Sequence, residues 1–472
     1  MKFCKYRSRY WTPITGFGEY SCELPSVNDK MELCKFHDPL YWKTNPEEVE
    51  REFVSILQRY NQDPNVKHIV FMGIHLPRIR LSGINLKKPL IILNSSIHGD
   101  LYILHSSIPT LWVGGNTKID GDLVIAGSNI DYLVFRDVWL DSLLIAGGSF
   151  SKSISLNRLF ATHCVVIRNL DSKEIILINV VSIKVFLYDL KMEYLEILVA
   201  ERYVDDKAMR SKVGTSKFFL TYISGLKELV IHGPISVRNI SFVGTQLPKT
   251  TVFEGVIWQS SSKDRIITLD EVNLGNHDPR DIQKHCIEVE KKLGCTIKKE
   301  GGDKLVPCHD ACFERYSIEY TLHSVLQVYR RIRSVLEENL LYDVASLCFI
   351  SEMELKRNYQ ERIINGTQVL KKRNWFYRLF SPLGLYRLIS LYGEDMSRAL
   401  LSLVITIAGY SGGYMELNHT SFINALYLST ATIFQLKSST PIELSEKIIG
   451  LILLANIAIT LRRNLERKSK VV

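Results

Sequence analysis

The sequence lacks the short motifs that mark the commonest catalytic sites. It contains no Walker phosphate loop, no GxGxxG after a predicted strand, no HExxH and no nucleophile elbow. The histidines and acidic residues of its central region stand mostly at turn positions, where side chains are usually solvated. We therefore expect that the protein is not an enzyme and has neither catalytic nor cofactor-binding residues.

Cysteines, apolar runs and net charge are also limited. Nine cysteines in 472 residues are too few for a disulfide scaffold, and the basic start MKFCKYRSRYWTP is not followed by the apolar run that a secretory signal needs. A mean hydropathy of +0.02 excludes a chain that spans a membrane along its whole length. The net charge of +9 is spread out, with no aromatic-rich basic cluster, so we expect no nucleic-acid partner. Membrane segments must be few, and we expect the soluble part in the cytoplasm.

Residues 66–260 contain a repeat. A phrase recurs as Gly99–Ile103 (GDLYI), Gly121–Ile125 (GDLVI) and Asp141–Ile145 (DSLLI). Apolar residues recur at every fifth or sixth position, a period that neither an α-helix nor an isolated strand has. These residues are Ile92, Ile97, Ile103, Ile108, Val113, Ile119, Ile125, Ile130, Phe135, Leu140, Ile145, Phe150 and Leu156. The fold class that this pattern predicts is mixed: a degenerate right-handed parallel β-helix, pentapeptide-repeat-like, followed by helices.

Each coil of such a β-helix needs about 20 residues, with Gly, Asn, Ser and Asp at its corners. The alternative is an ordinary β-sandwich, which predicts strands of about 5–6 residues with two-residue alternation. The segment Glu201–Lys217 breaks the period, and we expect it to leave the coils as a loop.

Residues 1–65 form a Cys/His-rich cap that ends in a helix beginning at Pro46. Cys4, Cys22, Cys34 and His37 are the ligand types of a tetrahedral Cys3His zinc site, so we expect a structural zinc ion there. Only Cys34 and His37 are closely spaced, and the alternative is three unrelated cysteines with a surface histidine. A second pair, Cys308-His309 with Cys312, has no obvious partners.

The C-terminal third contains two apolar segments, after a polar connector at 261–314 and cytosolic linker helices at 315–397. Neither Ala399–Met415 nor Ile448–Leu461 contains a charged residue, and the second is short enough that it also fits a buried core helix. Basic residues flank the pair on both outer sides, including a basic tail at 463–472, whereas Lys437 is the one Lys or Arg between positions 416 and 445. By the positive-inside rule, both termini and the soluble domains lie in the cytoplasm, beneath a cell membrane.

Between the two spans lies Phe422–Phe434 (FINALYLSTATIF), which is apolar but too short to cross a bilayer. It predicts a half-helix that enters the membrane without crossing it, as in pore-loop channels. We therefore predict a two-transmembrane-helix pore-loop module at 398–462.

The chain resembles the pentapeptide-repeat membrane proteins that end in a two-helix pore-loop channel module. The resemblance rests on short motifs in a shared order: Cys34–Pro39, Phe71–Pro77, Ser351–Arg357, Tyr386–Glu394 with Arg398, Tyr427–Phe434 and Glu446–Gly450. It implies an ion-channel-like homo-oligomer, a tetramer, with the β-helix as a sensor or as a docking domain for a protein partner. It also implies that the pore loop contains Thr432, Gln435, Lys437, Ser438 and Ser439.

The pore loop departs from that family at its selectivity filter. Where a potassium-type filter has Gly-Tyr-Gly-Asp, this chain has Lys437-Ser-Ser-Thr440. Gly lets backbone carbonyls point into a narrow filter, whereas a ring of lysines repels cations and favours anions. We therefore do not expect potassium selectivity. The alternative function is a non-conducting, membrane-anchored β-helix scaffold for protein–protein interaction.

Overall fold

The structure is a computed structural model of the whole chain, and it divides into two compact units. One unit contains Met1–Ser260 and Thr268–Ile318, and the other contains Ser261–Ile267 and Glu319–Val472. The residues described are 2–27, 32–200, 216–242, 244–258, 296–298, 305–307, 322–364, 367–434 and 440–469.

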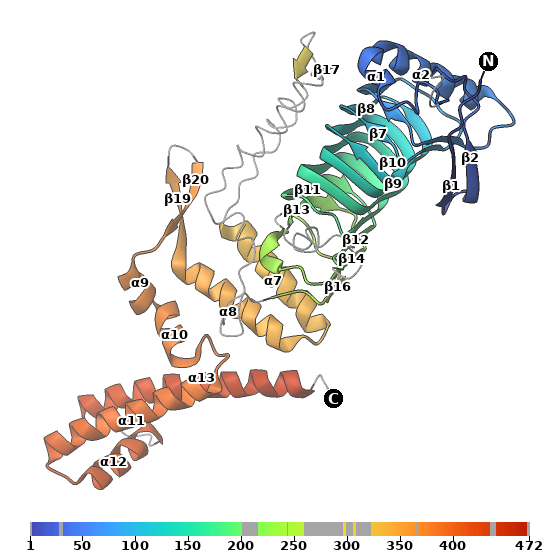
Figure 1. Ribbon diagram of the computed structural model, residues 1–472. Coiled ribbons are helices and arrows are strands. Elements are labelled where there is room, and N and C mark those ends of the chain that lie inside the picture. The colour runs from blue at the N-terminus through green and yellow to red at the C-terminus, as the bar shows by residue number, and fades with distance from the viewer. Residues whose placement is uncertain are drawn as a thin grey trace. The chain divides into compact units, whose positions relative to one another are not determined.

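The first unit is dominated by a parallel β-solenoid of about eight coils (Figure 1). Among the described residues, the strands of its sheet pair in parallel, each with the strand one coil further along, so a β-sandwich is excluded. Its strands are β3 (Ile69–Met72), β4 (His75–Leu76), β5 (Ile79–Ser82), β6 (Leu90–Leu93), β7 (Ser96–Ile97), β8 (Leu101–Leu104), β9 (Ser107–Ile119), β10 (Leu123–Ile178), β11 (Lys184–Lys191), β12 (Tyr194–Leu198), β13 (Lys217–Ser224), β14 (Glu228–His232), β15 (Ile240–Ser241) and β16 (Thr250–Glu254).

The register of the coils follows the repeated phrase. Leu101 pairs with Leu123, so Gly99–Ile103 stacks on Gly121–Ile125. Further along the solenoid, Cys164 pairs with Lys184, so the coils there are slightly shorter. All thirteen apolar residues of the five-to-six repeat are buried, at 3% exposure or less. The apolar residues of the repeat therefore belong to the buried core of this unit.

Polar residues shape the corners of the coils. Asn94, Asn116 and Asn179 have φ values of 48°, 67° and 50°, in the left-handed region that Asn tolerates better than most residues. Hydroxyl groups stack inside the corners: the backbone N–H of Ser106 donates to Ser128 Oγ at 3.1 Å. The Asp100 carboxylate likewise accepts a bond from the next coil, from the Asp122 N–H at 3.0 Å. The Asp100 carboxylate of the repeated phrase thus makes a hydrogen bond between neighbouring coils instead of being only solvated.

The break in the period corresponds to an insertion. Lys184 pairs with Lys217, a much longer step along the chain than the one from Cys164 to Lys184 in the preceding coil. Positions 201–215 of the predicted loop lie outside the described residues. The end of that loop was predicted one residue too late, because Lys217 already begins β13.

The N-terminal cap contains a hairpin of β1 (Arg7–Thr12) and β2 (Gly16–Ser21), followed by α1 (Tyr41–Thr44) and α2 (Pro46–Gln62). The predicted start of the helix at Pro46 is confirmed, with Pro at the first turn where its missing N–H costs nothing. One face of α2 is buried, and the Phe53 ring lies 4.7 Å from the ring of Phe71 in β3. In Figure 1, α2 lies across the end of the solenoid.

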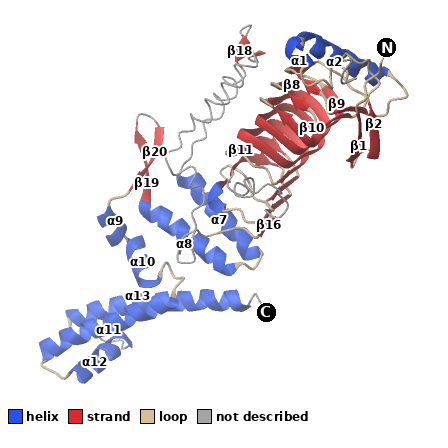
Figure 2. Cartoon of the chain, in the orientation of Figure 1, coloured by secondary structure: helices blue, strands red, loops and turns tan. Residues whose placement is uncertain are grey.

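The second unit is mainly helical (Figure 2). Its elements are α7 (Leu322–Glu338), α8 (Tyr342–Asn358), β19 (Tyr359–Ile364), β20 (Thr367–Lys372), α9 (Trp375–Phe380), α10 (Pro382–Ser390), α11 (Met396–Asn418), α12 (Phe422–Phe434) and α13 (Pro441–Ser469). The connector strands β17 (Thr296–Lys298) and β18 (Leu305–Pro307), which belong to the first unit, pair antiparallel with each other. The interval 315–397 was expected to be helical, yet β19 and β20 form an antiparallel hairpin within it. Asn365-Gly366 between two runs that contain β-branched residues is the sequence signal for that hairpin.

Two helices of this unit are long and apolar enough to cross a membrane. They are Met396–Asn418 and Pro441–Arg463, each of 23 residues, and the shorter apolar helix Phe422–Phe434 lies between them in the chain. Both are longer than the uncharged runs in the sequence, because the helices continue into polar turns such as the one that contains Glu443 and Glu446. Of the predicted pore-loop residues, Thr432 lies in α12, whereas Gln435, Lys437, Ser438 and Ser439 lie outside the described residues.

Candidate metal centre

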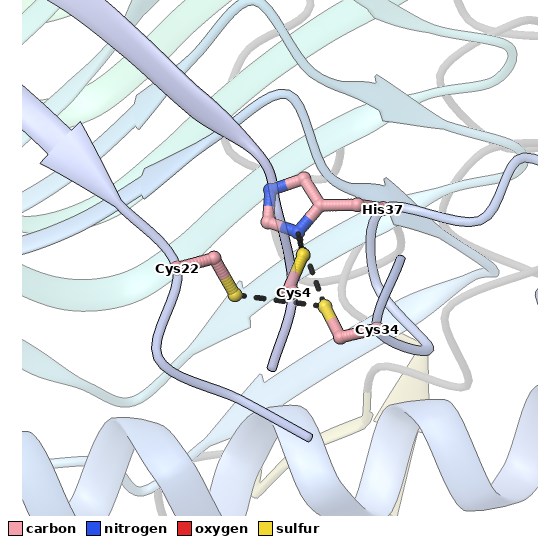
Figure 3. A group of neighbouring side chains, drawn as sticks. All are labelled: Cys4, Cys22, Cys34 and His37. Carbon is pink, nitrogen blue, oxygen red and sulfur yellow. Dashed lines mark hydrogen bonds between the residues drawn. The ribbon is translucent and has the colours of Figure 1, made fainter. Parts of the chain in front are cut away.

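Four potential metal ligands meet beside the first coil of the solenoid. Cys4 precedes β1, Cys22 follows β2, and Cys34 and His37 belong to the turn before α1. The antiparallel pairing of β1 with β2 brings Cys4 close to Cys22, although the whole hairpin separates them in the chain. Their ligand atoms all lie within 4.8 Å of one another, and all four residues are buried (Figure 3). The structure thus brings together the four ligands that the sequence predicts.

Three of the distances between these atoms are close to those around a tetrahedral ion. Cys22 Sγ lies 3.6 Å from Cys34 Sγ, and His37 Nδ1 lies 3.6 Å from Cys4 Sγ and 3.1 Å from Cys34 Sγ. A tetrahedral zinc ion requires sulfur atoms about 3.8 Å apart and sulfur and nitrogen atoms about 3.6 Å apart. The Cys22–Cys34 separation is far longer than a disulfide bond of about 2.05 Å. The geometry therefore fits four ligands around one ion better than a Cys22–Cys34 disulfide with Cys4 as a separate thiol.

Backbone N–H groups face each sulfur atom. Cys4, Cys22 and Cys34 are hydrogen bonded by the backbone of the residue two positions further on, which is Tyr6, Leu24 and Phe36 respectively. Such bonds stabilise thiolate, the form that binds metal ions. The hydrogen bond from the Cys22 thiol, followed by the one with His37, lowers the pKa of Cys34 well below the ordinary thiol range against the opposing effect of burial.

The other side of the His37 ring is also fixed. His37 Nε2 lies 2.9 Å from the carbonyl oxygen of Met72, so it donates its proton there and leaves Nδ1 to face the sulfur atoms. Metal-bound histidines commonly make such a second hydrogen bond, because it fixes the tautomer and the ring orientation. The Tyr6 ring stacks on the imidazole with centroids 4.1 Å apart. Since Met72 ends β3, the cluster is tied directly to the solenoid.

No protein family, curated protein or solved structure matches this chain.

The cluster holds together a cap that covers the outside of the first coils. Tyr6, Tyr10 and Tyr20 of the hairpin region pack against an apolar patch on the outer face of the solenoid. That patch consists of Met72, Ile91, Leu93 and Trp112. Without the cap these side chains would be exposed at the end of the coil stack. A metal ion in the cluster would therefore act structurally, by holding the hairpin and the Cys34 turn against this patch.

The second predicted Cys/His pair, Cys308-His309 with Cys312, lies outside the described residues. Cys164 and Cys348 are also buried, but neither belongs to this cluster. Sequence reasoning missed a histidine ladder on the solenoid surface. His98 Nε2 lies 3.3 Å from His75 Nδ1, and His98 Nδ1 lies 3.0 Å from the Asp120 carboxylate. The recurrence of these residues at the spacing of one coil is the signal that could have revealed the ladder.

A buried charge cluster in the second unit was also missed. The Glu354 carboxylate of α8 accepts bonds from the Tyr392 hydroxyl at 2.8 Å and from Arg357 at 2.6 Å, and it pairs with Arg387 of α10 at 2.6 Å. Burial, followed by the hydrogen bond to Glu354, raises the pKa of Tyr392. A neighbouring ion pair joins Glu394 to Arg463 of α13 at 3.1 Å. These contacts link α8 to the turn before α11 and to the end of α13.

The short helix α12 is held between the two long helices by polar contacts. Ser429 Oγ lies 3.1 Å from the carbonyl oxygen of Ile407 in α11 and within hydrogen-bond distance of the Glu446 carboxylate in α13. The Tyr414 hydroxyl donates to the same carboxylate at 2.6 Å. Glu446, Ser429 and Tyr414 are all buried. Three helices thus share one polar contact point.

Proposed function

We propose that the protein is an integral membrane protein that anchors a cytoplasmic β-solenoid of pentapeptide-repeat type, which serves as a rigid docking surface for a protein partner. The observation that carries this proposal is the exposed apolar surface of α11 and α13. Val404 and Ile405 of α11 are 60% and 61% exposed, and Leu451 and Ile452 of α13 are 53% and 51% exposed. A soluble protein seldom exposes so continuous an apolar surface, whereas a lipid-facing helix must.

The lengths and the flanking charges agree with this proposal. A helix of 23 residues is about 35 Å long, enough for a hydrocarbon core of about 30 Å. The basic residues around the start of α11 and in the last turns of α13, among them Arg398 and Arg463, favour a cytoplasmic location for both ends. The short coils of the solenoid, such as the one between the paired Leu101 and Leu123, support its pentapeptide-repeat interpretation.

We further propose that the ion held by Cys4, Cys22, Cys34 and His37 is zinc. Three thiolates and an imidazole are soft and borderline ligands that suit zinc and do not suit magnesium or calcium. The ion would replace part of the hydrophobic core that a small cap of this kind lacks. Its four ligands leave no open position for a substrate, so its role is structural.

Extraction from membranes tests the anchor. Full-length protein expressed in cells should stay with the membrane pellet in alkaline carbonate and be released by detergent. A variant truncated after Asp395 keeps the solenoid and lacks all three apolar helices, so it should appear in the carbonate supernatant. Full-length protein that leaves the membrane in carbonate would refute the proposal.

A second proposal, that the module forms an ion-channel-like pore, is favoured by α12. Ser429 and Glu446 hold this short apolar helix between the two longer ones. A pore loop needs such an arrangement, because irregular backbone at membrane depth must be enclosed by protein. One copy cannot enclose a pore, so this function requires a homo-oligomer, a tetramer in the family that the chain resembles. Single-channel recording of detergent-purified oligomer in a planar bilayer tests it, and electrical silence of an inserted tetramer leaves only the anchored scaffold.

A further inference from the structure

The short helix α9 exposes nearly all of its apolar side chains. Trp375, Phe376, Tyr377 and Phe380 are 63%, 55%, 68% and 56% exposed. Four large aromatic side chains in one short helix would normally be buried against other parts of a protein. Here they form an uncovered surface, which requires a partner.

This surface continues onto α10 and α11. Leu385 and Leu388 of α10 are 49% and 52% exposed, whereas Gly384 and Ser390 of the same helix are buried. On α11, Leu400 and Leu401 are exposed in turn. The uncovered apolar surface therefore extends along the chain from Trp375 into the first membrane span.

The joint between α9 and α10 is rigid. Ser381 caps α10, because its Oγ accepts the N–H of Gly384 at 3.1 Å, and Pro382 follows at the first helical position. A Cβ atom on Gly384 would collide with the carbonyl oxygens of Leu379 and Arg378, so the two helices approach closely there. The Arg357 guanidinium of α8 donates to the Arg378 carbonyl at 3.0 Å. The aromatic surface is thus fixed in place.

The charge of this segment indicates the partner. The interval 371–390 contains Lys371, Lys372, Arg373, Arg378 and Arg387, and no acidic residue. Trp and Tyr concentrate at the boundary between lipid headgroups and acyl chains, where an aromatic ring is partly dry and its polar group is wet. Basic residues near an acidic membrane surface add electrostatic attraction to it.

From these observations we infer that α9 and α10 form an interfacial anchor that lies in the cytoplasmic headgroup layer and binds acidic phospholipids. This inference rests on the proposed membrane anchoring, and it adds a lipid-binding surface outside the two spans. A second copy of the chain is the competing occupant. The basic residues disfavour it, because two copies would bring like charges together.

Depth-dependent fluorescence quenching tests the inference. Trp375 is the sole tryptophan after Trp258 in the chain, so the signal of wild type minus that of Trp375→Phe isolates it. The protein is reconstituted into phosphatidylglycerol-containing vesicles with lipids brominated either near the headgroup or near the chain end. We expect the shallow bromine to quench Trp375 at least about twofold more than the deep one, since an interfacial helix inserts only about 5–10 Å. Replacing phosphatidylglycerol by a neutral lipid should reduce this quenching.

Two further tryptophan signals distinguish failure of the interfacial anchor from failure of the membrane anchoring. Ile405→Trp, made in the Trp375→Phe background, reports on the middle of α11 and should be quenched most by the deep bromine. Trp42 of the cap, isolated in the same way with Trp42→Phe, should be quenched by neither lipid. If Ile405→Trp is quenched and Trp375 is not, the interfacial anchor is refuted and the span stands. If neither is quenched, the membrane anchoring itself fails. Equal quenching of Trp375 in neutral and acidic vesicles would refute the role of acidic lipid.

Discussion

Replacing one cysteine of the metal cluster should release zinc and loosen the cap. The variant is Cys22→Ser. The matched control is Cys164→Ser, because Cys164 is also buried but lies in the solenoid and outside the metal cluster. Structural zinc sites bind with an apparent free energy of about 10–16 kcal/mol at pH 7. Shared equally among four ligands, each contributes about 2.5–4 kcal/mol, so losing one should weaken zinc binding by about a hundredfold or more.

The structure also indicates which region should respond. The ion would join Cys4, Cys22 and the Cys34 turn, whereas α2 is held by its own buried face, which includes Phe53. Cys22→Ser should therefore expose the hairpin and the turn to protease while the solenoid remains folded. The tyrosines packed on Met72 should keep part of the cap attached, so the change is local.

Two measurements check this prediction on full-length, detergent-purified protein that carries no metal-binding tag. Elemental analysis should find about one zinc per wild-type chain and per Cys164→Ser chain, and much less in Cys22→Ser dialysed against a weak chelator. Limited proteolysis should then cut Cys22→Ser between Thr12 and Cys34 faster than either other protein. Less than about 0.2 zinc per wild-type chain would refute the site, since a structural ion is bound whenever its domain is folded.

Three other predictions concern the solenoid, the charge cluster and the pore loop. Ile125→Asp buries an unpaired charge inside a coil, so it should lower the free energy of unfolding by more than about 4 kcal/mol and abolish the monodisperse peak on size-exclusion chromatography. Tyr132→Asp, at an exposed position of β10, should keep that peak. Equal behaviour of the two variants would contradict the register of the coils. Glu354→Gln should destabilise the helical unit by about 2–3 kcal/mol and lower its melting temperature, because it leaves two arginines without their counter-charge. The control Glu337→Gln, which changes a half-exposed carboxylate, should leave the melting temperature unchanged. An unchanged melting temperature of Glu354→Gln would contradict the role assigned to Glu354. If the module conducts, Lys437→Glu should shift the reversal potential under a salt gradient toward cation selectivity, and an unaltered selectivity would mean that Lys437 does not face the pore.

The solenoid could be predicted because its information is local and periodic. Each side of a coil contributes one inward side chain. Apolar residues therefore recur at every fifth or sixth position from Ile92 to Leu156. The cap helix could be predicted for a similar reason, since Pro46 begins an amphipathic run. The metal ligands were harder, because only Cys34 and His37 are close in the chain and the β1–β2 hairpin brings the other two beside them.

Features that depend on contacts between distant residues could not be predicted. Glu354 and Tyr392 are 38 residues apart, and no periodicity relates them. Glu446 stands in a polar turn at the start of α13 and shortens the uncharged run of that helix. The number of uncharged residues therefore underestimates the length of α13, in which the Glu446 carboxylate is buried against Tyr414 and Ser429. The β19–β20 hairpin, in contrast, carried a local signal in Asn365-Gly366 that outweighs the helical character of its surroundings.

We propose that two spans anchor the solenoid with both chain ends on the cytoplasmic side. Single added cysteines at Thr420, between α11 and α12, and at Lys468, near the end of α13, report on the two sides of the membrane. Intact cells are treated with a membrane-impermeant maleimide, with wild type as the background for the native thiols. We expect Thr420→Cys to be labelled in intact cells and Lys468→Cys to be labelled only after permeabilisation. Labelling of both positions, or of neither, in intact cells would contradict two spans with a shared cytoplasmic side.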